Sequence, residues 1–241
     1  MQYYEFYIMG IILLPAIILS IVAEAKVKMA YKQNMEVLSQ KGITAHEVAE
    51  TILEKKGISE VAVTKVGGEL TDYYSDKEKT VALSSDIFSS TSVAAIGIAM
   101  HEVGHAIQYH EGYKPVAFRN LMVKVCNLSN KILWPLVVIG LLFNLAVVGG
   151  GVFGEICLWS GIGFFGLAAI FNLVTLPVEF DASNRAKSII QKESLLTKEE
   201  FDGASKVLNA AAWTYVAAMI VSIMNLVRFL LVVVLNSKKR D

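Results

Sequence analysis

Two histidines and a glutamate form the pattern in this sequence that is best suited to chemistry. His101, Glu102 and His105 give H-E-x-x-H, and they close an apolar-rich run, residues 92–100, that is expected to be helical. Residues four apart share one face of a helix, so both imidazoles could bind one cation, while Glu102 is turned by about 100° and could act on a water bound to that cation. This is the ligand pattern of a catalytic zinc. Because only four histidines occur in 241 residues, a chance match on an amphipathic helix is the weaker interpretation.

A catalytic zinc needs a third protein ligand and an open position for water. The candidates lie just after Pro177, where Glu179 and Asp181 stand two residues apart. On a helix these two carboxylates would point about 200° apart, so only one of them could join the same metal. Two histidines and one glutamate are a known catalytic set. An acid in the first turn of a helix is also favoured by the helix dipole alone, and the residues by themselves leave that interpretation of Glu179 open.

The composition indicates a membrane protein. Hydrophobic residues make up 54% of the chain and charged residues 18%, with a mean hydropathy of +0.51, whereas soluble domains are usually about a quarter charged. The 22 basic residues balance the 22 acidic ones, so no overall basic field suggests nucleic acid as a partner. Cys126 and Cys157 lie far apart without C-x-x-C spacing, which predicts small buried hydrophobes rather than a disulfide.

Apolar stretches predict about four transmembrane helices, each long enough for a hydrocarbon core of ~30 Å. They are residues 3–23, 132–148, 152–176 and 210–235. The chain is therefore expected to divide into five segments: an anchor (1–23), a cytoplasmic domain with the H-E-x-x-H helix (24–130), two transmembrane helices (131–176), a helical loop that supplies the third ligand (177–209), and a last transmembrane helix with a basic tail (210–241).

The positive-inside bias predicts the side of the membrane on which each polar segment lies. No Lys or Arg precedes the first span, whereas Lys26, Lys28 and Lys32 follow it, so residues 24–130 are expected in the cytoplasm. Two spans separate this segment from residues 177–209, which puts both on the same side. The basic residues 238–240 oppose the bias in a four-span protein, and a re-entrant last segment would return them to the cytoplasm.

The first polar segment is expected to be a mixed α+β domain. Thr44 and Glu47 have the spacing of a capping box, which predicts a helix to about Lys56. Short strands are expected at 61–66, 69–74 and 80–83, with a turn at Gly67-Gly68, and together they predict a small antiparallel sheet. Such a sheet could offer an edge to an extended substrate or could simply cover the helix, and the sequence leaves both open.

Four blocks of residues resemble the bacterial membrane neutral zinc metallopeptidase family. They are residues 92–105, 108–113, 175–183 and 208–218. The resemblance implies a membrane zincin with one Zn²⁺ per chain, held by His101 and His105, and with Glu102 as general base. The Glu179-Phe180-x-Ala182 block is also similar to the E-F-x-A-D block of prenyl-protein and heat-shock membrane proteases, in which the Glu is the third zinc ligand. This similarity favours Glu179 over Asp181.

The chain departs from those relatives at two places. Ser183 stands where they have an Asp that would support a zinc-bound histidine, although a hydroxyl could make a weaker form of the same contact. Residues 72–75 are Asp-Tyr-Tyr-Ser, where family members often show an Asp-His-Tyr-Asp stretch. Any role of a histidine at that place is therefore in doubt.

The resemblance implies a multi-pass enzyme of the bacterial inner (cell) membrane that hydrolyses peptide bonds with metal-activated water. Its expected partners are the lipid bilayer and proteins or peptides near the membrane, and the oligomeric state is open. By chemistry alone, the candidates for oxyanion stabilisation or support of the ligands are Tyr109, Ser183, Arg185, Asn209 and Tyr215.

The alternative function is a non-catalytic membrane scaffold or transporter subunit with a structural metal. A site-2-type intramembrane protease is disfavoured because polar residues directly precede Val93.

Overall fold

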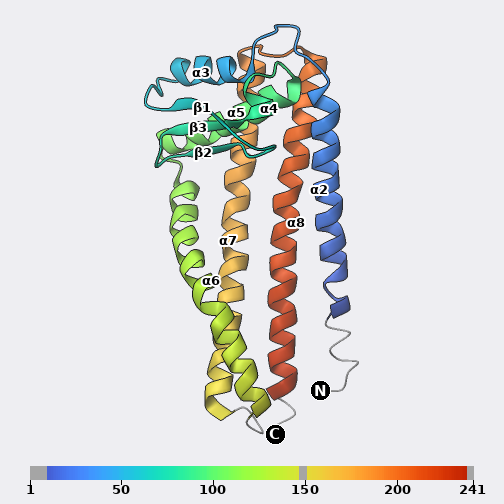
Figure 1. Cartoon of the computed structure of the whole chain (residues 1–241), viewed down its shortest axis with the longest axis vertical. Helices are drawn as coiled ribbons and strands as arrows, with labels where there is room; N and C mark the ends of the chain where they lie inside the picture. Colours follow the sequence, from blue (N-terminus) through green and yellow to red (C-terminus); the bar gives the residue numbers. More distant parts are fainter. Residues whose placement is uncertain (1–9, 147–150, 238–241) are drawn as a thin grey trace. The chain divides into compact units, whose positions relative to one another are not determined.

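The computed structural model describes residues 10–146 and 151–237 (Figure 1). The described chain is mainly helical with one small sheet, as expected. Its elements, in chain order, are α2 (Leu14–Met35), α3 (Ala45–Lys55), β1 (Ala62–Val66), β2 (Tyr73–Ser75), β3 (Thr80–Ser84), α4 (Ser85–Phe88), α5 (Val93–His110), α6 (Lys114–Ala146), α7 (Gly151–Lys192) and α8 (Lys198–Ser237).

Contacts divide the chain into two compact units. The mixed unit comprises Val22–Ala117 and Pro177–Thr214, and the helical unit comprises Met1–Ile21, Phe118–Leu176 and Tyr215–Asp241. Every strand and all of α3, α4 and α5 belong to the mixed unit. The expected division into five segments stays a prediction.

The sheet of the mixed unit is mixed, so the prediction of an antiparallel sheet is wrong. Its strand order is β1-β3-β2, with β3 parallel to β1 and antiparallel to β2. The reason lies in the burial of β3, in which Val81, Ala82 and Leu83 are fully buried. A strand that is apolar at successive positions takes the centre of a sheet, while the more polar β1 and β2 form its edges. The Gly67-Gly68 turn therefore does not join neighbouring strands.

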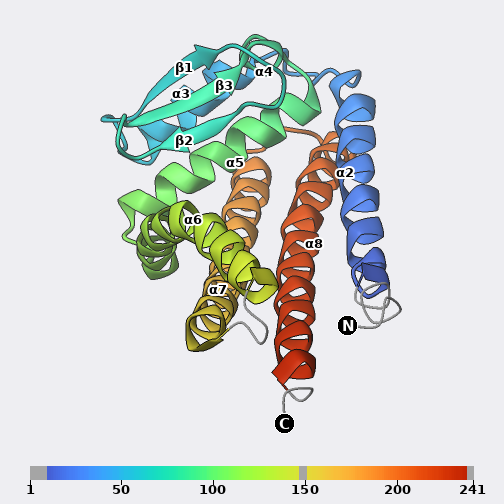
Figure 2. The same ribbon diagram turned by 60° about the horizontal axis from the view of Figure 1, so that its bottom comes forward.

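Two helices pack on this sheet and on each other, and both form where the sequence predicts them. α3 begins after Thr44, whose hydroxyl accepts from the Glu47 amide while the Glu47 carboxylate accepts from the Thr44 amide, which confirms the capping box. α5 begins after Ser92, whose hydroxyl caps the amide of Ala95. α5 runs beside the edge strand β2 (Figure 2). Its many buried residues join the largest hydrophobic core of the mixed unit.

The helices that contain the second, third and last apolar stretches are longer than expected: α6, α7 and α8 extend beyond those stretches. α6 continues through Pro135 and α7 through Pro177. Glu179 was expected in the first turn of a new helix after Pro177, and this expectation is wrong: α7 is continuous and Glu179 lies well inside it. A proline removes one backbone hydrogen bond, and a long helix supported by its neighbours can absorb that loss. The expected turn at 149–151 lies mainly outside the described residues.

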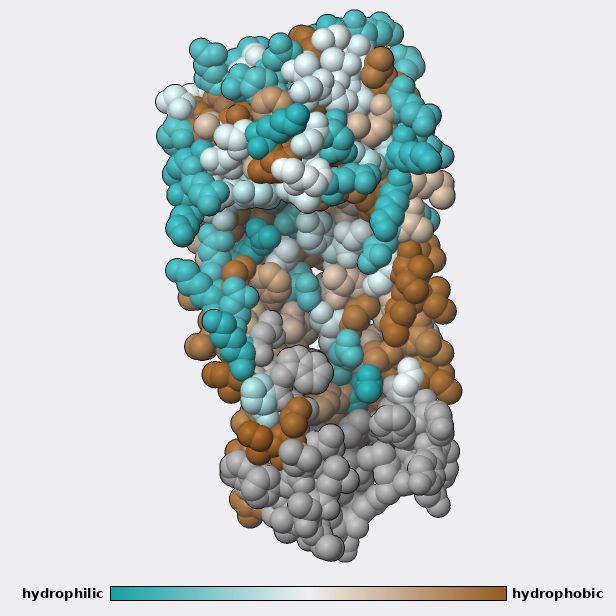
Figure 3. Space-filling model, in the orientation of Figure 1, coloured by the Kyte–Doolittle hydropathy of each residue, from teal (hydrophilic) through white to brown (hydrophobic). Residues whose placement is uncertain are grey.

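The expected number of four spans is corrected to two candidate spans among the described residues. They are Trp159–Lys192 within α7 and Lys198–Leu231 within α8, each with an apolar window of which only a small share is buried. The expected first span falls partly on residues 1–9, which are not described, and charged residues from Glu24 onward shorten the apolar part of α2. Figure 3 still shows hydrophobic side chains gathered along the N-terminal half of α2.

In the helical unit, polar and aromatic side chains link α7 to α8. Asn172 donates to the Ser222 hydroxyl at 2.6 Å. The rings of Phe165 and Phe229 lie 5.1 Å apart, centroid to centroid. Hydrogen bonds between side chains are favourable for helices in a lipid environment, where water cannot take their place.

Candidate metal centre

The two histidines of the motif project from one face of α5, as their spacing predicts. The ring centroids of His101 and His105 are 4.8 Å apart, and the rings are nearly perpendicular at 81°. His105 is buried and His101 is partly buried. Helical geometry accounts for this pairing because residues four apart lie one above the other on the helix surface.

The third group comes from α7. Glu179 Oε2 lies 3.3 Å from His101 Nε2 and 3.4 Å from His105 Nε2, and the residue is only 2% exposed. Burial would lower the pKa of His105, but the hydrogen bond to Glu179 and the negative charges of Glu102 and Glu179 outweigh burial and raise that pKa. The site therefore has a carboxylate between two imidazoles.

Close packing of backbones brings Glu179 to the histidines. A Cβ added at Gly104, inside the H-E-x-x-H motif, would stand 2.7 Å from the carbonyl oxygen of Ala182. Only glycine allows α5 and α7 to approach this closely. At a second place on α5, a Cβ at Gly97 would lie 3.3 Å from that of Ala204 in α8.

The ring nitrogens that face away from Glu179 both have polar partners. The Ser183 hydroxyl oxygen lies 3.1 Å from His101 Nδ1. Gln108 Oε1 lies 2.9 Å from His105 Nδ1. Gln108 was not among the predicted site residues. Its position three residues after the second histidine, on the same face of a buried helix, is the signal that could have found it.

Asp181, the rival of Glu179 in the sequence, does not point at the histidines. Its Oδ2 accepts hydrogen bonds from Gln108 Nε2 at 2.8 Å and from Arg185 Nε at 2.6 Å. The two carboxylates thus face different partners, as expected for residues two apart on one helix.

Glu102 lies on α5 between the two histidines in sequence and is only 8% exposed. Its charge acts on His105 and on Asp72, the residue that accepts hydrogen bonds from the Ser84 amide and hydroxyl. Burial, opposed by those hydrogen bonds and reinforced by Glu102, raises the pKa of Asp72. The role of Glu102 as a general base stays a prediction.

The other residues with candidate roles have varied surroundings. Arg185 binds Asp181 and Glu111, and its guanidinium lies 5.7 Å from the centre of the Tyr113 ring. The Asn209 side chain accepts from Lys187 at 2.5 Å, and the ring of Tyr109 lies 5.2 Å from that of Tyr74. Tyr215 belongs to the helical unit. Their proposed roles in oxyanion stabilisation stay predictions.

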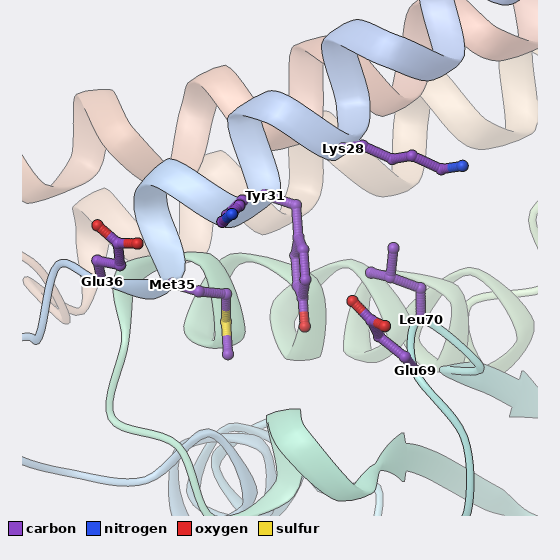
Figure 4. Close-up of a pocket in the computed structure, with 7 residues that line it drawn as sticks. Lys28, Tyr31, Met35, Glu36, Glu69 and Leu70 are labelled. Carbon is purple, nitrogen blue, oxygen red and sulfur yellow. The ribbon is translucent and has the colours of Figure 1, made fainter.

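A separate pocket of the mixed unit contains none of the candidate site residues. It lies between α2 and the loop after β1, where Tyr31 and Met35 face Glu69 and Leu70 (Figure 4). The Tyr31 hydroxyl donates to Asp86.

The donor set fits zinc. Imidazole nitrogen and carboxylate oxygen are zinc ligands, and donors bound at ~2.0–2.1 Å in a tetrahedron are about 3.3 Å apart. The two nitrogen-to-oxygen distances at Glu179 have this length and are longer than most direct hydrogen bonds. The candidate ligand atoms of His101, His105 and Glu179 all lie within 4.8 Å of one another.

Comparisons with known proteins agree with this donor set. Residues 9–234 match the family model described as "Putative neutral zinc metallopeptidase". The chain is 40% identical over 216 residues to the Bacillus subtilis (strain 168) protein named "Putative membrane protease YugP", which covers 89% of this chain and 91% of that protein. No solved structure shows a significant match. The chain therefore belongs to this family of zinc metallopeptidases.

Proposed function

We propose that this member of the family is a membrane-embedded zinc endopeptidase that cleaves membrane-associated proteins at the cytoplasmic side of the bacterial cell (inner) membrane. The observation that carries the proposal is the position of one Glu179 carboxylate oxygen within 3.4 Å of the Nε2 atoms of both histidines. Two imidazoles and one carboxylate leave a fourth coordination position for water, which is the mark of a catalytic rather than a structural zinc site.

In this proposal His101, His105 and Glu179 hold one Zn²⁺ per chain. When bound, the ion lowers the pKa of a coordinated water and polarises the carbonyl of the peptide bond. The Glu102 carboxylate accepts a proton from the attacking water and later gives it to the leaving amine nitrogen. Because Glu102 is turned away from the ligand face, its carboxylate stays available for this transfer.

The surroundings of Glu102 support its proposed role. The residue is 8% exposed, so little bulk water competes for its carboxylate. Electrostatic interactions are stronger in such a pocket than in water, and a positioned carboxylate base contributes about 10²–10⁴-fold to a rate.

Two features of the sequence around the site support a location at the cytoplasmic side of the membrane. Glu179 lies in α7 within the candidate span Trp159–Lys192, which supports a metal site near lipid. Lys26, Lys28 and Lys32 favour the cytoplasm for the mixed unit. The name of the Bacillus subtilis relative supports both the membrane and the protease parts of the proposal.

Replacing Glu102 tests this function. Glu102→Gln keeps the size of the side chain but cannot accept a proton, so the purified full-length variant should retain zinc and lose casein cleavage by a factor of about 10² or more. The matched control is Glu50→Gln, an exposed surface position that pairs with His46. Retained zinc with undiminished cleavage in Glu102→Gln would overturn the role of Glu102. Zinc without cleavage in either the unchanged protein or the variant would favour the scaffold.

A further inference from the structure

Gln108 is a fully buried side chain whose amide makes three polar contacts beside the metal centre. Its exposed fraction is 0%. Its Oε1 lies 2.9 Å from His105 Nδ1, and its Nε2 donates to the carbonyl of Val178 and to Asp181 Oδ2, both at 2.8 Å. The single amide of Gln108 thus connects a ligand on α5 to the part of α7 that carries Glu179.

The two acceptors fix which way the amide points. A backbone carbonyl accepts hydrogen bonds and cannot donate, so the amide nitrogen of Gln108 must face Val178 and the carboxylate beside it. The oxygen of the amide then faces His105, and an amide oxygen can only accept. Nδ1 of His105 must therefore carry the proton. This leaves the lone pair of Nε2, the atom 3.4 Å from Glu179, to bind a cation.

We infer that Gln108 is the positioning residue of the metal centre and that Asp181 acts through it. Gln108 holds His105 in the Nδ1–H tautomer and fixes the orientation of its ring. The inference rests on His105 being a metal ligand, as proposed above. Metal-bound histidines usually donate to a carboxylate or a backbone carbonyl directly. Here a neutral amide stands between the imidazole of His105 and the carboxylate of Asp181.

The far end of this chain of hydrogen bonds is anchored by Arg185. Its Nε donates to Asp181 Oδ2 and its Nη1 to Glu111 Oε2, both at 2.6 Å. Glu111 is the C-cap of α5, so the guanidinium ties the end of that helix to α7. Exposed ion pairs contribute little to stability. The contribution of Arg185 in this place is to hold Asp181 where Gln108 can reach it.

The zinc dissociation constant of the full-length protein tests the inference without relying on activity. Gln108→Met removes both the acceptor and the donor at similar volume, and should weaken zinc binding by about 10–100-fold in competition with a chromophoric chelator. Gln191→Met, at an exposed position of α7, is the matched control and should bind zinc like the unchanged protein. The double variant Gln108→Glu/Asp181→Asn again offers His105 an acceptor and puts a donor at position 181. It should recover part of the lost affinity, since the donor to the Val178 carbonyl stays absent. A loss of packing alone would allow no recovery.

The tautomer can also be read in the unchanged protein, so the inference stays testable even if Gln108→Met does not fold. Histidine side-chain nitrogen NMR of the zinc-loaded protein should show His105 protonated at Nδ1. Protonation at Nε2 instead, or a folded Gln108→Met variant with unchanged zinc affinity, would overturn the inference while leaving the proposed function intact. Failure of the unchanged protein to bind zinc would overturn both.

Discussion

Gly104 and Ala182 bring the two halves of the candidate metal centre together. Gly104 lies inside the H-E-x-x-H motif on α5, and the carbonyl oxygen of Ala182 on α7 stands only 2.7 Å from where a Cβ would be. The Cα and carbonyl carbon of Ala182 are each 3.3 Å from the same point. These are backbone atoms, so no side chain can turn aside to make room. The position of Glu179 relative to the histidines therefore depends on the absence of a side chain at residue 104.

We expect Gly104→Ala to separate α5 from α7. The helices must move apart by a few tenths of an ångström or more, which should reduce zinc content and casein cleavage together and lower the free energy of unfolding by about 1–3 kcal/mol. Metal analysis and thermal unfolding of the purified protein measure both effects. Gly163→Ala is the control, because a Cβ there meets no atom within 4 Å. A Gly104→Ala protein with full zinc content would show that the contact does not set the site.

A second prediction concerns the hydroxyl beside His101. Ser183→Ala removes the polar group 3.1 Å from His101 Nδ1, so zinc should bind about tenfold more weakly while the fold is unchanged. Zinc competition with a chelator measures the affinity. Ser188→Ala on the same helix, five residues later and turned to another face, serves as the comparison. Equal zinc affinity in the two variants would mean that the hydroxyl contributes nothing to the ligand.

A third prediction concerns pH and Asp72. Because burial raises the pKa of this carboxyl above its unfolded value, the folded state binds more protons than the unfolded state between the two pKa values. The free energy of unfolding should therefore fall as the pH rises through that interval and level off above it. Asp72→Asn carries no titrating group there, so its thermal midpoint relative to the unchanged protein should be higher at neutral pH than at about pH 4. A difference that is the same at both pH values would contradict this assignment.

Local sequence signals predict the parts of the fold that depend on neighbouring residues. Thr44 and Glu47 form the predicted capping box, and Ser92 caps the helix that carries the histidines. The pairing of His101 with His105 follows from helical periodicity alone. Glu179 required the resemblance to related proteases, because the residues left its role open.

Contacts between residues that lie far apart in the chain could not be predicted from the sequence. β3 lies between β1 and β2, and its apolar residues are buried on the side of α4 and α5. Alternation of polarity along a strand does not specify this strand order. A proline next to an apolar stretch favoured a helix boundary at Pro177, yet α7 continues through it. The contact of Gln108 with Asp181 joins residues that lie 73 positions apart, and no local pattern specifies it.

Zinc content after removal of the third ligand tests the central claim most directly. Full-length Glu179→Ala and Glu102→Gln proteins, purified in parallel and analysed for metal, should differ sharply: Glu102→Gln should hold zinc in the same proportion as the unchanged protein, and Glu179→Ala should have lost nearly all of it. A Glu179→Ala protein that binds zinc as tightly as the unchanged chain would contradict the assignment of His101, His105 and Glu179 as the metal centre.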